Sequence, residues 1–390
     1  MTIIITICAL LLLAYAFDLT SSKTKIPSVI LLLFLGWVVR QITILLNFRL
    51  PDFTLILPIL GTIGLILIVL EGSLDLELNK SKLKLVKKSL LGSLLSMLAM
   101  AFSLGYLFKY FGDVSLIDGL TNAIPFCVIS SAIAIPSVRH LSSSLKEYIV
   151  YESSFSDISG VVFFNFVALN DNFNASSYGH FALQLLIILI ISFVATYVLT
   201  ILLGRIEHHI KFIPIILLII LIYAITKEYH LPALIFIMLF GLFLGNLDKL
   251  KRFKFINSNR LDNLGKEVIR FKEINVEITF LIRALFFLLF GYLIETPEII
   301  NTQTLIWAIG IVMLIFAFRT VQLLISRLPL IPLLFVAPRG LITILLFLSV
   351  AETQQIPLVN KSLIIQVIIL TALIMMVGII ITKKGAEIET

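Results

Sequence analysis

Long apolar runs separated by short polar links make up almost the whole chain. Each run is roughly 20 residues long, which is the length that an α-helix needs to cross a lipid bilayer. The runs lack the alternation of polar and apolar positions that the strands of a membrane β-barrel show. The pattern predicts an all-α polytopic membrane protein with about thirteen transmembrane helices. We place them at residues 2–17, 27–46, 52–71, 85–111, 117–140, 145–170, 180–203, 212–227, 231–247, 274–295, 303–327, 332–352 and 362–383.

The charged residues support this prediction and orient the helices. Charged residues make up only 14% of the chain, whereas soluble domains contain about 25%. Of the 30 Lys and Arg residues, 22 lie in the links after odd-numbered runs or in the C-terminal tail, and four lie in the opposite links. Because basic residues accumulate in cytoplasmic loops, we expect the N-terminus outside and the C-terminus in the cytoplasm. The same loops are expected to contact membrane lipids rather than nucleic acid.

The longest link bears on the domain organisation. Residues 246–273 are basic and partly amphipathic, which predicts an interfacial helix that joins two halves of the chain. A regulatory or lipid-sensing role is the alternative. If runs 1–6 and 8–13 are two inverted repeats, run 7 connects them. We therefore divide the chain into residues 1–203 (first repeat and linker helix), 204–273 (runs 8 and 9 with the basic link) and 274–390 (core runs 10–13 of the second repeat).

Ionisable residues inside the runs are few, and they indicate function because a charge inside a bilayer is costly. The most informative are Glu71 at the end of run 3, Glu152 and Asp157 in run 6, Arg283 in run 10, Arg319 in run 11 and Arg339 in run 12. We expect Arg319 to form a structural ion pair. Arg283 either neutralises the C-terminal end of an interrupted helix or extends toward the membrane surface.

Run 6 places a carboxylate among small polar residues. Ser153 and Asp157 are four residues apart, so they share one helix face and can contact the same ion. Ser156 and Gly160 flank this face and leave room beside it. Glu152 lies about 140° around the helix from Asp157, so the two acids need different partners. The alternative is a packing surface of small residues in which Asp157 is hydrogen-bonded structurally.

Two runs carry signals for an interrupted helix. Run 5 contains Ser130, Ser131 and Pro136, and a proline in mid-span frees a carbonyl and tends to break the helix. Hydroxyls and a freed carbonyl are suitable ligands for a monovalent cation, although a plain kink is the alternative. Run 12 contains Arg339 between Pro338 and Gly340, which predicts a second break beside a permanent positive charge. Interrupted helices at matching positions of two repeats indicate a transporter binding site.

Five segments, in order and over nearly the whole chain, are similar to motifs of one transporter family. Residues 152–162 (ESSFSDISGVV) resemble the ESLxNDGxGVV helix of the sodium/proton exchanger branch of the monovalent cation:proton antiporter superfamily, in which an Asn-Asp pair marks the site. The other matches are residues 25–36 (KIPSVILLLFLG), 70–76 (LEGSLDL), 286–293 (FFLLFGYL) and 338–341 (PRGL).

The resemblance implies a role for each matching residue. Asp157 would bind the cation and the proton in turn, and Ser153 would be a cation ligand. Glu152 would form a structural ion pair with Arg339, and Glu71 would lie near a cytoplasmic or central cavity. The resemblance also implies a homodimer.

Two positions depart from the pattern of the family. Its interrupted run 5 carries Thr-Asp-Pro, whereas this chain has Ser130-Ser131-Ala132, so that Ser131 replaces an acid. The Asn before the transport Asp is Ser156. With Ser130, Ser131 and Ser156 at these positions, Asp157 is the one certain carboxylate of the expected site.

Together these features predict a secondary transporter of the bacterial inner membrane that exchanges a monovalent cation for H+ around Asp157. One exchangeable carboxylate predicts electroneutral exchange. The resemblance favours Na+, with Li+ or K+ as alternative substrates. A K+/H+ antiporter, a channel-like pathway and a non-transporting sensor on the same scaffold stay open. Cys8 and Cys127 lie inside apolar runs, and neither a metal-ligand spacing nor a catalytic motif is present, so we expect no cofactor, no resident metal and no enzyme.

Overall fold

The structure, a computed structural model, describes residues 2–24, 26–46, 53, 55–76, 82–138, 141–170, 173–206, 208, 210–247 and 258–388. Within these ranges the chain is helical and contains no strand, which confirms the all-α prediction. The longer helices are α1 (Thr2–Thr24), α2 (Ser28–Leu45), α3 (Ile56–Asp75), α4 (Leu83–Gly112), α7 (Ser143–Ala168), α8 (Ala175–Arg205), α9 (Phe212–Glu228), α10 (Leu234–Gly245), α12 (Ser258–Tyr292), α14 (Thr302–Ile325) and α16 (Lys361–Ile388). The shorter elements are α5 (Leu116–Ala123), η2 (Ile124–Phe126), α6 (Ser131–Ser137), α13 (Thr296–Ile300), η3 (Leu333–Phe335), α15 (Leu341–Leu348) and η4 (Glu352–Gln354).

Every one of the thirteen predicted runs coincides with a helical segment. Among the described residues, eight of these segments are long and apolar enough to cross a membrane, and the chain is an integral membrane protein. Helices α9 and α10 contain only 17 and 12 residues. The total of thirteen crossings therefore stays a prediction.

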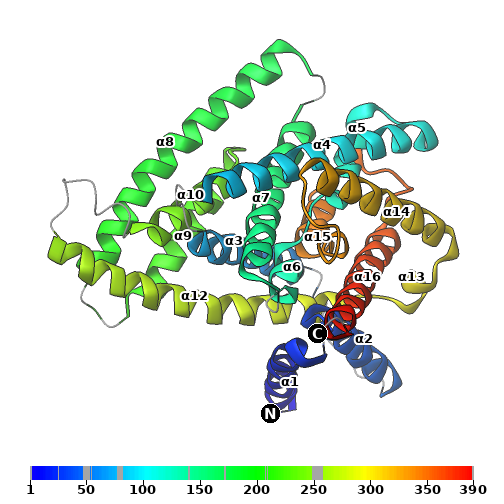
Figure 1. Ribbon diagram of the computed structural model, residues 1–390, viewed down its shortest axis with the longest axis horizontal. Helices are drawn as coiled ribbons and strands as arrows, with labels where there is room; N and C mark the ends of the chain where they lie inside the picture. The colour runs from blue at the N-terminus through cyan, green and yellow to red at the C-terminus, as the bar shows by residue number, and fades with distance from the viewer. Residues whose placement is uncertain are drawn as a thin grey trace.

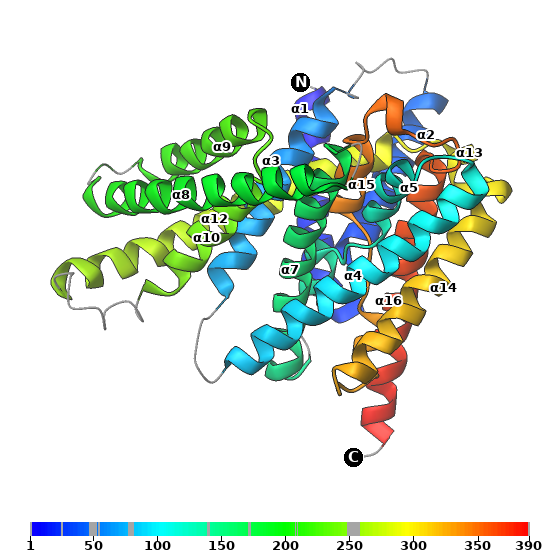
Figure 2. The same cartoon turned by 90° about the horizontal axis from the view of Figure 1, so that it is seen from above.

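The described helices pack in two groups (Figures 1 and 2). In the first group, α12 lies against α2 and α3, and α3 also packs against α10. In the second group, α4 lies against α5, α7 and α14, and α14 packs against α16. Helix α3 connects the groups, because it also contacts α6, α7 and α15. Helix α8 lies at the edge of the molecule (Figure 1), and its exposed apolar side chains, among them Ile190 and Phe193, form a surface suited to lipid.

Glycines allow the helices of the first group to approach closely. A Cβ atom added to Gly36 of α2 would collide with the backbone carbonyl of Leu288 in α12. In the reverse direction, a Cβ atom on Gly291 would collide with the carbonyl of Leu33. Within a bilayer, where burial of apolar surface gives little drive for association, such contacts between backbones are a main source of packing energy.

The two predicted interruptions are present, and they meet. The first lies between η2 and α6, and the second between η3 and α15. The backbone amide of Ser130, in the first interruption, donates a hydrogen bond to the carbonyl of Pro338 in the second, at 2.9 Å. The first break lies directly before Ser131, within the segment that the family resemblance matched to an interrupted helix. Pro136, which the proline signal alone indicated, lies in the last turn of α6. Its missing N–H there affects only the end of a helix that stops at Ser137.

The predicted linker helix is not a separate element where the structure describes it. Residues 248–257 lie outside the described residues. From Ser258 onward the link and run 10 form the single 35-residue helix α12. The division of the chain at residues 203 and 273 remains a prediction.

Candidate functional site

Asp157 lies in α7 with its side chain fully enclosed by protein. The residue is 1% exposed, and its Oδ2 atom accepts a hydrogen bond from the hydroxyl of Ser131, the first residue of α6. Among the described residues, the other carboxylate oxygen, Oδ1, has no hydrogen-bond partner. A buried carboxylate needs a compensating proton or cation, so this free oxygen can hold either one.

The neighbouring serines fix α7 to the interruption. Ser156 Oγ accepts a hydrogen bond from the backbone amide of Ile129 at 2.9 Å. A Cβ atom added to Gly160 would collide with Val128, so the absence of a side chain lets the interruption lie directly on α7. The candidate site therefore has two walls, the middle of α7 and the segment from Val128 to Ser131.

The second interruption closes the site from another side. A Cβ atom on Gly340 would lie 2.8 Å from Ser130 Oγ and 2.7 Å from Ile133 Cδ1. The structure thus brings Ser130, Ser131, Ser156 and Asp157 together where the interruptions cross. Ser153 is also buried, but its hydroxyl donates to the carbonyl of Ile149 within α7, at 2.7 Å. Because its hydrogen is used in this bond, Ser153 can contact a cation only through the lone pairs of its Oγ atom.

The predicted ion pair between Glu152 and Arg339 is wrong. Glu152, which is fully buried, pairs with Nη1 of Arg319 in α14. Arg339 instead donates from Nε to the carbonyl of Phe126 at 2.5 Å and from Nη1 to the carbonyl of Ala337 at 3.1 Å. The reason is local, because the interruption leaves carbonyls without helical partners beside Arg339, and a guanidinium donates to them at short range. The prediction that Arg319 forms a structural ion pair is confirmed.

Two further residues that bond Glu152 were not identified from the sequence. The Tyr148 hydroxyl donates to Glu152 Oε1 at 2.8 Å, and Gln322 Nε2 donates to the same oxygen. Helical spacing is the signal that could have found them. Tyr148 precedes Glu152 by four residues on α7, and Gln322 follows Arg319 by three on α14.

Glu71 and Arg283 lie away from the crossing. Glu71 is half-buried near the end of α3, beside Gly72, whose added Cβ atom would lie 3.1 Å from Ser154 Oγ of α7. Arg283 is half-buried in α12 and forms no ion pair or hydrogen bond with any described residue. The structure therefore brings neither residue into hydrogen-bond contact with Asp157, and their roles remain predictions.

A cavity of about 300 Å³, which we call the vestibule, opens between the two groups of helices. On one wall Lys82 pairs with Glu147 at 2.9 Å, and on the other Lys272 pairs with Asp75. Tyr151, nearly two turns before Asp157 on α7, also lines it. The lining residues are Asp75, Leu76, Lys82, Ser143, Lys146, Glu147, Val150, Tyr151 and Lys272.

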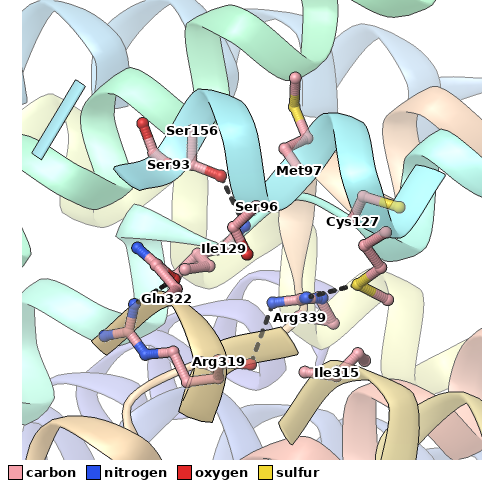
Figure 3. A pocket seen from close by; sticks show the side chains of 12 residues that line it. Ser93, Ser96, Met97, Cys127, Ile129, Ser156, Ile315, Arg319, Gln322 and Arg339 are labelled. Atoms are coloured by element: carbon pink, nitrogen blue, oxygen red, sulfur yellow. Dashed lines mark hydrogen bonds between the residues drawn. The ribbon is translucent and has the colours of Figure 1, made fainter. Parts of the chain in front are cut away.

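A smaller cavity, about 20 Å³, lies inside the second group of helices (Figure 3). We call it the arginine cavity because Arg319 and Arg339 both line it. Ser156, the neighbour of Asp157, lies on its wall together with Ser93 and Ser96 of α4.

Comparison with solved structures shows the same fold in a transporter. The sodium proton antiporter MjNhaP1 from Methanocaldococcus jannaschii, solved at pH 8, has 19% sequence identity and a TM-score of 0.65, over 97% of this chain and 95% of that chain. An electron-microscopy structure of the same antiporter gives 18% identity and a TM-score of 0.67, over 98% and 94%. A comparison with curated protein sequences gives no match.

The sequence itself matches a family along most of its length. Residues 7–383 fit the family described as sodium/hydrogen exchanger, transmembrane. The match includes both interruptions, the whole of α7 and the vestibule. This chain therefore belongs to the sodium/hydrogen exchanger family, whose members are membrane transporters and not enzymes.

Proposed function

We propose that this chain exchanges a monovalent cation for protons by competition of the two ions for Asp157. The observation that carries the proposal is the free, buried Oδ1 atom of Asp157 at the crossing of the two interruptions. A proton on this carboxylate and a cation beside it each neutralise the same charge, so they exclude one another. Binding of one ion then releases the other.

The cation ligands in this proposal are oxygen atoms. Asp157 supplies the charge, and the hydroxyl oxygens of Ser131, Ser130 and Ser156 would complete the coordination, with Ser153 as a further ligand. Hard monovalent cations are bound by carboxylate, hydroxyl and carbonyl oxygens. The fold shared with a sodium proton antiporter supports Na+ as the substrate, and Li+ and K+ are the alternatives.

The vestibule is the proposed approach to the site from the cytoplasm. It lies between the two groups of helices, and Tyr151 on its wall is about 9 Å along α7 from Asp157. Movement of the second group relative to the first would close this approach and open one from the outer side, as alternating access requires. We further propose that the protein is a homodimer of the bacterial inner membrane, with the N-terminus outside and the C-terminus in the cytoplasm.

Proton flux in everted vesicles tests the function. Acid-loaded vesicles that contain the protein should lose their proton gradient when Na+ is added, and Li+ and K+ tested in turn should define the substrate. Exchange requires both ions, so the proton flux should depend on the cation in a saturable way. A cation flux that needs no counter-moving proton would indicate a channel-like pathway instead. An absence of flux with all three cations would favour a sensor.

A further inference from the structure

The arginine cavity contains more hydrogen-bond donors than its protein surroundings can satisfy. Arg319 is 2% exposed, and its Nη2 atom has no partner among the described residues. Arg339 is also 2% exposed, and its Nη2 atom donates to the thioether sulfur of Met100 at 3.8 Å, which is a weak acceptor. Figure 3 shows both guanidinium groups at the cavity, with Ser96 beside them.

The charges around the cavity do not balance. Glu152 compensates Arg319, whereas Arg339 forms no ion pair within the described part of the chain. The carbonyl of Phe126 ends the half-helix formed by α5 and η2, and the dipole of such a helix end offers only about half a negative charge. A buried guanidinium therefore retains positive charge beside a polar cavity, which is costly without an anion.

The remaining polar groups on the wall favour an acceptor as the occupant. Ser93 donates to the carbonyl of Leu90, and the Cys127 thiol donates to the carbonyl of Ala123. Ser156 Oγ already accepts from Ile129, and the Gln322 amide accepts from Arg319 and donates to Glu152. The hydroxyl of Ser96 has no partner among the residues that the structure describes and can donate into the cavity.

We propose that the arginine cavity binds one small monovalent anion, chloride under ordinary conditions, between Arg319, Arg339 and Ser96. Chloride accepts several hydrogen bonds and donates none, which matches these donors. The volume of about 20 Å³ is enough for at least one particle of the size of water, so a small anion is the simplest occupant. The anion neutralises the excess positive charge of the two buried arginines, so it stabilises the fold whether or not the protein transports.

Chloride dependence of thermal stability tests this site independently of exchange activity. Purified protein in detergent is melted in choline chloride, choline bromide, choline gluconate and choline sulfate at equal ionic strength, without sodium. Chloride and bromide should raise the melting temperature by about 2–5 °C in a saturable way, and gluconate and sulfate should not. Binding of radioactive chloride should saturate at one ion per chain.

Substitution of Ser96 locates the site. In Ser96→Asp the tethered carboxylate replaces the anion, so the chloride dependence of the melting temperature and the chloride binding should disappear. Ser103→Asp is the matched control, because Ser103 lies two turns later on α4, bonds the carbonyl of Ala99 and does not line the cavity. Ser96→Leu, which fills the cavity, should also lose chloride binding. Equal melting temperatures in chloride and gluconate, with no saturable chloride binding to the wild type, would show that the cavity holds water only and overturn the proposal.

Discussion

The hydroxyl of Ser131 donates a hydrogen bond to Asp157 and thereby joins the first residue of α6 to the middle of α7. The contact links an interrupted helix directly to the one carboxylate at the crossing. Movement of α6 therefore changes the surroundings of Asp157.

Ser131→Ala should weaken cation binding without preventing exchange. The change removes a hydroxyl ligand and a hydrogen bond to a charged group, a loss of about 1.5–3 kcal/mol. The cation concentration for half-maximal exchange should rise at least about tenfold in the vesicle assay. Ser137→Ala is the matched control on the same helix, since the Ser137 hydroxyl bonds only the carbonyl of Ile133. Equal cation dependence in the two variants would place Ser131 outside the site.

Glu152 and Arg319 should depend on one another for stability. Removal of either charge leaves the other buried and uncompensated, at a cost of about 3–5 kcal/mol. Glu152→Gln and Arg319→Gln should each lower the melting temperature in detergent, and the double variant should lose much less than the sum of the two. Glu152→Gln combined with Arg339→Gln is the control cycle and should be close to additive. The reverse pattern would restore Arg339 as the partner of Glu152.

Gly340→Ala should separate the two interruptions. Its Cβ atom would lie within 3 Å of both Ser130 and Ile133, so the segments must shift, at a cost of about 1–3 kcal/mol. The variant should melt earlier and exchange more slowly. Gly310→Ala is the control, because a Cβ atom on Gly310, within α14, meets nothing within 4 Å. If both variants behave like the wild type, the close contact at Gly340 has no part in the site.

Exchange should be electroneutral. Asp157 is the only carboxylate at the crossing among the described residues, and Arg339 stays protonated throughout a cycle because a guanidinium does not release its proton. One proton exchanged for one monovalent cation moves no net charge. Proteoliposomes whose membrane potential is set with potassium and valinomycin should show a sodium-driven proton flux that does not change with the potential. A flux that scales with voltage would reveal a second titrating group, and Glu71 is the first to examine.

The helices and Asp157 could be predicted from the sequence, because both are recognisable from neighbouring residues in the chain. Apolar length predicts a helix in a bilayer, and Asp157 is conspicuous as a carboxylate among small residues in such a run. The partner of Glu152 could not be predicted in this way. Its angular position on α7 shows that it faces away from Asp157, but four arginines, Arg40, Arg283, Arg319 and Arg339, lie inside other runs. Only the packing of α14 within the second group of helices, where it lies against α4, selects Arg319.

The position of the first interruption also depended on the tertiary structure. The general rule that proline breaks a helix pointed to Pro136, whereas the helix is interrupted before Ser131, in the segment that only the family resemblance indicated. The backbone groups released there are satisfied by partners far away in the chain, Pro338 and Arg339. No local signal identifies such partners.

Sodium-driven proton flux through Asp157→Asn tests the central claim most directly. The amide cannot exchange a proton for a cation, so flux in proteoliposomes should fall to the level of protein-free vesicles while the protein remains folded and inserted. Asp113→Asn is the control, because Asp113 ends α4 with a positive φ of 48° that asparagine also adopts, and it should exchange like the wild type. Wild-type flux through Asp157→Asn would contradict the account.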